Sequence, residues 1–287
     1  MTEQEETGLI DDIIRGAIAE DFGKNGDITS RAIFDDTQCG CAVIKSKDTG
    51  VLSGVYLLKP VFFALSPLLA VDCLLTDGSR LEPGSPICTL HGPIRGILGG
   101  ERIALNFLQR LSGIATSAAE CVDLISRTTA KLLDTRKTTP LLRLLEKRAV
   151  RHGGGFNHRF GLFDMVLIKD THIKAAGGIA NAIAKTRSFV SAARSKIKIE
   201  CEVQTWEEFL EAVETAPDRI MLDNMNTGLL AKCVSFARGK GAPMELEASG
   251  NITPETIVQV AETGVDFISM GSLTHSVKAL DIHLVIE

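Results

Sequence analysis

Two groups of charged residues with opposite signs follow short apolar runs in the second half of the chain. The cationic group consists of Arg136, Lys137, His158, Arg159 and Lys169. The anionic group consists of Glu200, Glu202, Asp223, Glu245 and Glu247. Guanidinium groups bind carboxylates and phosphates through two hydrogen bonds at once, so the first group predicts a ligand with several negative charges. The second group predicts bound Mg²⁺ or ribose hydroxyls. The alternative interpretation is a set of surface salt bridges.

The spacing of two of these carboxylates adds a constraint. Glu200 and Glu202 are two residues apart in a strand-like run, so their side chains share a face, whereas Cys201 points into the helix layer. Two ionised carboxylates that face the same protein interior repel each other unless a cation lies nearby. The sequence therefore predicts a metal ion, a ligand or a lysine close to them.

Two glycine-containing segments are candidates for binding phosphate. Ser249-Gly250-Asn251 lies between a predicted strand and a helix expected from Pro254, and amides at a helix N-terminus bind phosphate. Gly271-Ser272 follows the last predicted strand and supplies the second half of such a site. Gly153-Gly154-Gly155 fits neither the P-loop nor the dinucleotide fingerprint, and we interpret it as a loop that lets backbone approach a ligand.

Lys169 admits a second kind of chemistry. A lysine at the end of a barrel strand could form a Schiff base with a carbonyl substrate, as in a barrel aldolase or lyase. The neighbouring Asp170 and the other cations favour a phosphate or carboxylate ligand instead. We interpret His172 and His275 as structural.

The segments that must position these residues alternate between strand-like and helical patterns. The strand-like runs are KLLDTRK at 131–137, MVLIKD at 165–170, IKIECEV at 197–203, RIMLDN at 219–224, MELEASG at 244–250 and VDFISMG at 265–271. Helical patterns lie between them, including 141–151 and 180–194. This alternation predicts a parallel sheet. Polar residues end nearly every run, which favours a closed or incomplete α/β barrel over an open sheet with one switch point.

The first half of the chain has a different pattern. Apolar residues at helical spacing predict an amphipathic helix over 7–20, and β-type runs between turn residues fill 39–90. A further helix is predicted from Gly99, with Arg102 on its polar face. Its apolar stripe consists of Ile103, Phe107, Leu108 and Leu111.

Composition narrows the class of protein. The 287 residues are 45% hydrophobic and 23% charged, and the net charge of −5 argues against a nucleic-acid partner. No apolar run approaches the ~20 residues of a membrane span, and the N-terminus lacks signal-peptide features. The seven cysteines form no CxxC pair, so we expect buried free thiols in a reducing compartment. We therefore expect a cytoplasmic protein that binds neither nucleic acid nor membranes.

Several of these segments resemble the quinolinate phosphoribosyltransferase family, the carboxylating nicotinate-nucleotide pyrophosphorylases. The matching runs are GDITS at 26–30, ERIALNFLQRLSGIAT at 101–116, DTRKTTP at 134–140, LEKRAVRHGGGFNHRFGLFDMVLIKD at 145–170, ECEV at 200–203, MLDNM at 221–225, EASGN at 247–251 and GVDFISMGSLTHS at 264–276. They cover essentially the whole chain in the expected order. DTRKT together with GGGxNHRxGLxDxxLIKD is highly specific to the family.

The resemblance implies an α/β subunit of two domains. An N-terminal α/β sandwich over 1–112, joined by the C-terminal tail 274–287, accompanies an incomplete parallel α/β barrel over 113–273. The active site is expected at the C-terminal ends of the barrel strands. The resemblance also implies a homodimer in which one subunit's sandwich covers the barrel mouth of the other, and it leaves assembly beyond the dimer open.

The resemblance further implies roles for individual residues. The quinolinate carboxylates are expected to contact Arg136, His158, Arg159 and Lys169, with Thr135 and Lys137 beside them and Arg102 of the partner subunit reaching in. Glu202 and Asp223 are expected to hold the ribose hydroxyls and Mg²⁺. The 5′-phosphate is expected at Ser249, Gly250, Asn251, Met270, Gly271 and Ser272. The expected catalytic residues are Lys137, Lys169, Glu202 and Asp223.

The implied reaction converts quinolinate and phosphoribosyl pyrophosphate into nicotinate mononucleotide, pyrophosphate and CO₂, a step of de novo NAD biosynthesis. Two positions depart from the family pattern: Thr171 replaces the Asn of KDNH, and Asn251 replaces the second Gly of SGG. Asn tolerates positive φ better than most residues, so the phosphate turn is expected to survive. Two alternatives stay open, a Schiff-base aldolase or lyase using Lys169 and a non-catalytic paralogue that binds an oxyanion or pyridine ligand.

Overall fold

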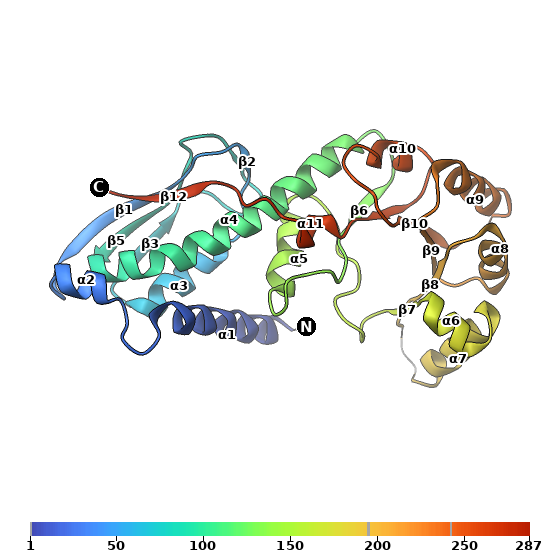
Figure 1. The fold of residues 1–287 in the computed structure, drawn as a ribbon, viewed down its shortest axis with the longest axis horizontal. Helices are drawn as coiled ribbons and strands as arrows, with labels where there is room; N and C mark the ends of the chain where they lie inside the picture. Colours follow the sequence, from blue (N-terminus) through green and yellow to red (C-terminus); the bar gives the residue numbers. More distant parts are fainter. Residues whose placement is uncertain (1, 194–195, 242) are drawn as a thin grey trace. The chain divides into compact units, whose positions relative to one another are not determined.

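The computed structural model describes residues 2–193, 196–241 and 243–287. The chain divides into two compact units. Unit 1 comprises Met1–Ala119, Thr139–Gly154 and Ser276–Glu287, and unit 2 comprises Glu120–Thr138 and Gly155–His275. Each unit has its own sheet, and Figure 1 shows how the chain passes between them.

The core of unit 1 is an antiparallel sheet with the strand order β12-β1-β5-β3. Its strands are β1 (Cys39–Ser46), β3 (Ala70–Cys73), β5 (Pro86–Pro93) and β12 (Ile282–Ile286), and a separate pair is formed by β2 (Gly50–Val51) and β4 (Arg80–Leu81). Ala42 of β1 pairs with Ile286 of β12, so the end of the chain returns to the first strand (Figure 1). The return of the C-terminal tail to the N-terminal sheet agrees with the expectation from sequence.

Helices complete unit 1. They are α1 (Glu3–Phe22), α2 (Ile28–Ile33), the short 3-10 helix η1 (Val55–Leu57), α3 (Leu58–Leu65), α4 (Ile94–Leu124) and α5 (Arg143–His152). Most of the predicted apolar stripe of α4 is confirmed, because Ile103, Leu108 and Leu111 are buried and Phe107 is half-buried, while Arg102 is exposed. The helix starts earlier and ends later than the pattern indicated, and its last residues belong to unit 2.

The helix α5 belongs to unit 1, although the sequence assigns the whole of 113–273 to a barrel. A buried ion pair accounts for this placement. The Arg110 guanidinium donates to Glu146 Oε1 at 2.7 Å, and Glu146 Oε2 accepts the Thr139 amide at 3.1 Å. Glu146 is fully buried, so loss of this pairing would leave a charge without water or partner. The ion pair therefore ties α5 to α4.

Unit 2 is built on a parallel sheet with the strand order β6-β11-β10-β9-β8-β7. Its strands are β6 (Lys131–Leu133), β7 (Val166–Ile168), β8 (Ile199–Val203), β9 (Arg219–Asp223), β10 (Glu245–Ser249) and β11 (Phe267–Ser269). Its helices are α6 (Asp170–Ala176), α7 (Ile179–Ala192), α8 (Trp206–Thr215), α9 (Thr227–Gly239), α10 (Ile257–Ala261) and α11 (Ser272–His275). The six predicted strands and the incomplete barrel are confirmed. Arg194, the last residue of one predicted helix, lies outside the described residues.

The curled sheet of unit 2 has β6 and β7 as its two edges. Beside β6, Phe156 makes an isolated parallel bridge with Leu133. The Phe156 amide donates to the Leu132 carbonyl at 2.8 Å, and the Asp134 amide donates to the Phe156 carbonyl at 3.2 Å. The segment around Phe156 therefore continues the hydrogen-bonding pattern beyond β6 for a single residue, which fixes where the following loop begins.

The seven cysteines are free thiols, as expected. Their predicted burial is only partly right, because four are buried and Cys39, Cys41 and Cys73 are exposed. The exposed cysteines lie on β1 and β3 of unit 1, where alternate strand residues face away from the core. No helix within the described part of the chain combines the length and apolar character that membrane crossing requires.

Candidate active site

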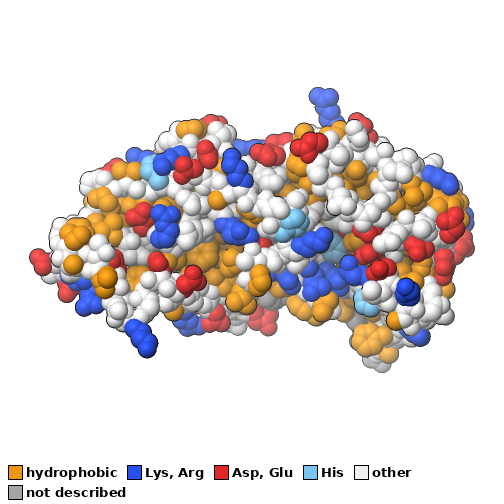
Figure 2. Space-filling view, in the orientation of Figure 1, with side chains coloured by type: hydrophobic (Ala, Val, Ile, Leu, Met, Phe, Trp, Pro, Cys, Tyr) orange, Lys and Arg blue, Asp and Glu red, His pale blue; other side chains and the backbone are white. Residues whose placement is uncertain are grey.

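A pocket of about 410 Å³ lies at the carboxyl ends of the strands of unit 2. All six strands, or the residues directly after them, contribute to its wall. The lining residues are Thr135, Arg136, Lys137, His158, Arg159, Leu167, Lys169, Glu202, Met221, Asp223, Asn224, Ser249, Gly250, Asn251 and Ser269. On the face of unit 2 seen in Figure 2, Lys and Arg side chains gather next to Asp and Glu side chains. The predicted cationic group therefore meets Glu202 and Asp223 of the predicted anionic group in one cavity.

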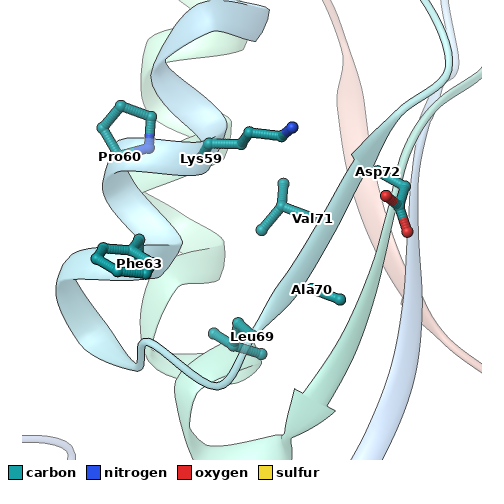
Figure 3. Close-up of a pocket in the computed structure, with 7 residues that line it drawn as sticks. All are labelled: Lys59, Pro60, Phe63, Leu69, Ala70, Val71 and Asp72. Carbon is teal, nitrogen blue, oxygen red and sulfur yellow. The ribbon is translucent and has the colours of Figure 1, made fainter.

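A second cavity, of about 490 Å³, lies between α3 and β3 in unit 1. It is lined by Lys59, Pro60, Phe63, Leu69, Ala70, Val71 and Asp72. Figure 3 shows Val71 pointing toward α3 and Asp72 pointing away from it, with Lys59 on the helix opposite. This wall is mainly apolar and its two charged groups do not converge. The smaller cavity of unit 2 is therefore the better candidate active site.

Two guanidinium groups occupy the cationic side of the pocket. Burial lowers the pKa of Arg159, and the nearby charge of Arg136 lowers it further. One Arg159 nitrogen donates to the Met165 carbonyl at 3.3 Å, which leaves other donors of the fork for a ligand. Two cations held close together are unfavourable unless an anion lies between them. The arrangement is typical of a site for a ligand with more than one negative charge.

Lys169 and Glu202 link the two halves of the pocket. The Lys169 ammonium lies 3.1 Å from Glu202 Oε2, and the carboxylate is largely buried while the lysine is half-exposed. This confirms the prediction that a lysine lies close to the paired carboxylates of β8. The contact with Glu202 favours an electrostatic role for Lys169 in the pocket over a Schiff base.

Asp223 adds a second carboxylate at the end of the neighbouring strand. Its Oδ2 accepts Nδ2 of Asn224 at 2.8 Å and Nε2 of Gln204 at 3.3 Å. Asn224 has φ 56°, a left-handed conformation that lets its side chain fold back toward the strand end. Glu202 and Asp223 therefore present oxygen ligands on adjacent strands at one wall of the pocket.

The predicted phosphate turn has the backbone geometry that its sequence suggests. Gly250 has φ 98° and Asn251 has φ 51°, so the Asn that replaces the family's second Gly adopts the left-handed region. A Cβ added at Gly250 would lie 2.3 Å from Asn224 Oδ1, so a side chain does not fit there. Asn251 Nδ2 donates to the same oxygen at 3.1 Å, which ties the turn to the end of β9.

Three predicted mouth residues lie elsewhere. Glu200 and Glu247 are fully buried below the pocket, and Glu245 begins β10 at the opposite end of the sheet. A strand advances about 3.3 Å per residue, so Glu245 lies roughly 13 Å from Ser249 along β10 although both face the same side. Glu245 pairs there with Arg219 at 3.0 Å and Lys198 at 3.1 Å. Its assignment to the mouth was wrong.

The residues expected at the 5′-phosphate after β11 lie next to the pocket lining. The Met270 amide donates to the Leu133 carbonyl at 3.0 Å, and Met270 is buried. A Cβ on Gly271 would lie 2.9 Å from Lys137 Cδ, so this glycine allows Lys137 to pass close to the backbone. Gly271 and Ser272 are half-buried at the start of α11.

Comparison with known proteins identifies the family of the chain. The chain matches the family description "Quinolinate phosphoribosyl transferase, N-terminal domain" over residues 27–112. It matches "Quinolinate phosphoribosyl transferase, C-terminal domain" over residues 114–285. The chain belongs to the quinolinate phosphoribosyltransferase family. The two matches cover nearly the whole sequence, as the resemblance of its motifs implied.

Relatives within this family are similar over most of their length. The chain is 44% identical over 265 residues to the probable carboxylating nicotinate-nucleotide pyrophosphorylase of Bacillus subtilis (strain 168), covering 92% of this chain and 89% of that protein. It is 42% identical over 290 residues to the chloroplastic carboxylating nicotinate-nucleotide pyrophosphorylase of Arabidopsis thaliana, covering 96% and 82%. The solved nicotinate-nucleotide pyrophosphorylase of Francisella tularensis has a TM-score of 0.92 and 40% identity, covering 98% and 96%.

Asp134 is a positioning residue that the sequence analysis did not assign to the site. Its fully buried carboxylate accepts the His158 amide at 2.8 Å and the Asn157 side-chain amide at 2.6 Å. It thereby holds the loop that carries His158 and Arg159, two of the family's characteristic residues. Asp134 opens the DTRKT motif, so its position two residues before Arg136 was the available signal.

Two further predictions concern residues outside the pocket wall. Arg102 belongs to unit 1, where it is exposed on α4. His172 is structural, as expected, because its Nδ1 accepts the Lys169 amide at 3.0 Å at the start of α6. Thr171, the departure from KDNH, lies in the first turn of that helix, where its amide donates to Asp170 Oδ1 at 2.7 Å.

Proposed function

We propose that this chain catalyses the family's reaction, in which quinolinate and phosphoribosyl pyrophosphate give nicotinate mononucleotide, pyrophosphate and CO₂. The observation that carries the proposal is the pocket of unit 2, which joins two guanidiniums to two carboxylates. Arg136 and Arg159 suit a dicarboxylate, and Glu202 and Asp223 suit ribose hydroxyls. The reaction supplies nicotinate mononucleotide to NAD biosynthesis.

The chain's own residues act mainly by positioning. Arg136, Arg159, His158 and Lys169 bind the two carboxylates, with Lys137 and Thr135 beside them, so that the pyridine nitrogen faces the ribose carbon that loses pyrophosphate. Holding two reactants in attack geometry converts a bimolecular step into an effectively unimolecular one. Attack leaves the ring nitrogen positively charged. That charge stabilises the electron pair left on the adjacent carbon when CO₂ departs, and a proton from water then takes the place of the lost carboxylate. No covalent bond to the enzyme is required.

The donors at the anionic wall fit Mg²⁺. This ion prefers oxygen ligands, commonly one or two carboxylates together with water and substrate phosphates. Glu202 and Asp223 supply such oxygens on adjacent strands, and Ser249, Gly250 and Asn251 lie beside them for the 5′-phosphate. When bound, the ion would neutralise charge on the departing pyrophosphate. Gly271, Ser272 and the backbone at Met270 are proposed to complete the phosphate site.

A homodimer with a shared site is part of the proposal. Arg102 is exposed on the polar face of α4, and ERIALN around it matches the segment that the family places at the dimer interface. Arg102 of the partner subunit would add a further cation to the quinolinate carboxylates. The cytoplasmic location expected from sequence stays a prediction.

The test is turnover of the purified chain with quinolinate, phosphoribosyl pyrophosphate and Mg²⁺. Expected products are nicotinate mononucleotide and CO₂ in equal amounts, measured by chromatography and by release of label from the 2-carboxylate. Product formation without CO₂ would move the chain to another phosphoribosyltransferase class. Borohydride trapping of a substrate adduct on Lys169 would instead favour the aldolase or lyase alternative, and tight binding without turnover would favour a non-catalytic binding protein.

A further inference from the structure

A charged layer lies directly below the active-site pocket, inside the barrel of unit 2. Its members are Glu200 on β8, Arg219 on β9, Glu247 on β10 and His158 on the loop beside β6. Glu200 and Glu247 are 0% exposed, and Arg219 and His158 are 8% exposed. Barrel interiors are usually filled with layers of branched apolar side chains. A charged layer at this position therefore requires an explanation.

The contacts inside the layer converge on His158. Its Nε2 lies 3.0 Å from Glu200 Oε2 and 3.5 Å from Glu247 Oε2. Arg219 holds the second carboxylate from the other side, with Nη1 donating to Glu247 Oε2 at 2.9 Å. Burial raises the pKa of Glu247 to about 7, and the charge of Glu200 raises it as well. Burying this layer therefore costs desolvation free energy that a purely apolar core would not cost.

The remaining contacts of His158 connect this layer to the pocket wall. Its Nδ1 accepts the Arg159 amide at 2.7 Å, so the ring proton belongs on Nε2, which faces the two carboxylates. Its own amide donates to Asp134 at 2.8 Å. Among the four members of the layer, His158 alone also lines the pocket. The ring therefore lies between the two carboxylates below it and the Arg159 amide, which its Nδ1 accepts.

We propose that Glu200 and Glu247 are positioning residues for the quinolinate site, which hold the His158 ring in one orientation and through it set the Arg159 backbone. The proposal rests on the proposed function, since it assigns these carboxylates to the dicarboxylate end of the substrate. The two glutamates of β8 then have different roles. Glu202, two residues closer to the mouth, acts in the pocket itself, whereas Glu200 acts only through His158.

A metal ion is the competing occupant of the layer. The ligand atoms of His158, Glu200 and Glu247 lie within 4.8 Å of one another, which a divalent cation could bridge. However, Glu247 Oε2 already accepts a guanidinium proton of Arg219, and the charge of Arg219 also lowers the pKa of Glu200. The geometry therefore favours a histidine held by carboxylates over a histidine that ligates a metal.

The first test measures steady-state kinetics of Glu200→Leu, Glu200→Gln and the control Cys201→Ala in the intact protein. Cys201 is fully buried on the same strand and points away from the pocket, so its truncation perturbs the packing of β8 alone. Misplacing a binding group by about 1 Å can cost roughly a hundredfold. We expect Glu200→Leu to raise KM for quinolinate by at least about tenfold, with KM for phosphoribosyl pyrophosphate little changed.

The conservative variant and the control complete this test. Glu200→Gln keeps an acceptor oxygen near Nε2 and should recover most of the lost quinolinate affinity, while Cys201→Ala should behave as wild type. Equal KM values for quinolinate in all three variants would overturn the proposal. A rise in both KM values together, shared by Cys201→Ala, would show a merely structural role and would overturn it as well.

A spectroscopic test does not depend on turnover or on any glutamate variant. Protein labelled with ¹⁵N-histidine contains six histidines, and the His158 signal is identified by its loss in His158→Asn. We expect the wild-type ring to carry its proton on Nε2. A proton on Nδ1 would overturn the proposal even if the enzyme turns over quinolinate, and so would a stoichiometric metal ion in the purified protein that Glu200→Gln releases. Conversely, an Nε2 proton without turnover would overturn the proposed function and leave the geometry of the layer intact.

Discussion

Single residues account for the choice of ligand at this site. Arg136 and Arg159 lie close enough for the charge of one to lower the pKa of the other, and Lys169 adds an ammonium beside them. Cations held this closely are stabilised only when an anion occupies the space between them. The residue types were evident in the sequence, because Arg136 and Lys169 end strand-like runs and Arg159 belongs to the family motif after the glycine run. Their mutual distance was not, since it depends on how the strands curl.

Removing either guanidinium should abolish tight quinolinate binding. Arg136→Ala and Arg159→Ala each leave a substrate carboxylate without its bidentate partner, which costs on the order of 2–5 kcal/mol. Titration calorimetry with quinolinate measures the loss, and circular dichroism checks the fold. Arg127→Ala, at an exposed arginine of the same unit, is the control and should bind normally. Near-normal affinity in either pocket variant would mean that the clamp is assigned to the wrong residues.

The same cations should exclude nicotinate, which has one carboxylate. Binding it would leave part of the cationic wall unpaired, and buried groups without partners discriminate strongly between substrates. We expect kcat/KM for nicotinate to lie at least about a thousandfold below that for quinolinate, which competition between the two substrates measures. Comparable values would contradict the dicarboxylate assignment.

The buried carboxylates should make stability depend on pH. Burial raises the pKa of Glu247 from 4.5 to about 7 in the folded protein, and the charge of Glu200 adds to the effect while His158 and Arg219 oppose it. The folded state therefore binds the proton more tightly than the unfolded state does. The contribution of Glu247 to stability is complete below about pH 4.5 and is lost as the pH rises through about 7.

Replacing this carboxylate by a neutral amide should flatten that dependence. Urea unfolding of wild type and Glu247→Gln at several values from about pH 5 to about pH 8 compares the two slopes. We expect the wild type to lose more free energy of unfolding over this range than the variant. Glu262→Gln, at an exposed glutamate of the same unit, should follow the wild-type curve. Parallel curves for wild type and Glu247→Gln would show that Glu247 ionises in the same way in both states.

The order of strands and helices was predicted well from the sequence. How far each strand residue lies from the mouth of the pocket was not predicted. Alternation showed that Glu245, Glu247 and Ser249 share a face, yet only Ser249 reaches the mouth. If the first residue of β10 had been known, the rise per residue would have placed Glu245 at the end of the strand away from the pocket. The helix α5 shows another limit. Its amphipathic pattern does not indicate which unit the helix packs against. The contact that decides this is the buried ion pair between Arg110 and Glu146.

The turn between β10 and α10 should tolerate no side chain at Gly250. Its φ of 98° strains any L residue, and an added Cβ would lie 2.3 Å from Asn224 Oδ1. We expect Gly250→Ala to lose more than about 1 kcal/mol of stability and to raise KM for phosphoribosyl pyrophosphate more than KM for quinolinate. Gly264→Ala has a similar positive φ of 86° away from the pocket, so it should lose stability with both KM values unchanged. Equal KM values for phosphoribosyl pyrophosphate in the two variants would mean that this turn does not bind the phosphate.

The residues proposed for a complete site come from both units of the chain. Within unit 2 the pocket is lined by most of the expected residues of the barrel, with Met270, Gly271 and Ser272 next to its lining, and Arg102 is the expected residue that lies in unit 1. It stands exposed on the polar face of α4 together with Asn106. An exposed arginine on a helix is ordinarily a solvated charge. The family motif around it is the reason to expect a role in the site of a partner subunit.

Complementation between two inactive variants tests that role. Arg102→Ala and Lys169→Ala should each be inactive alone, the first for want of a cation from the partner subunit and the second for want of one within the barrel. In a mixed dimer with shared sites, one site carries both lesions and the other carries neither. Subunits are exchanged by mild denaturation, and exchange is confirmed by mass spectrometry of the intact dimers. Random pairing makes half the dimers mixed and leaves half their sites intact, so about a quarter of wild-type activity should return under two-fold symmetry. Exchanged dimers without activity would mean that Arg102 serves its own subunit or no site at all.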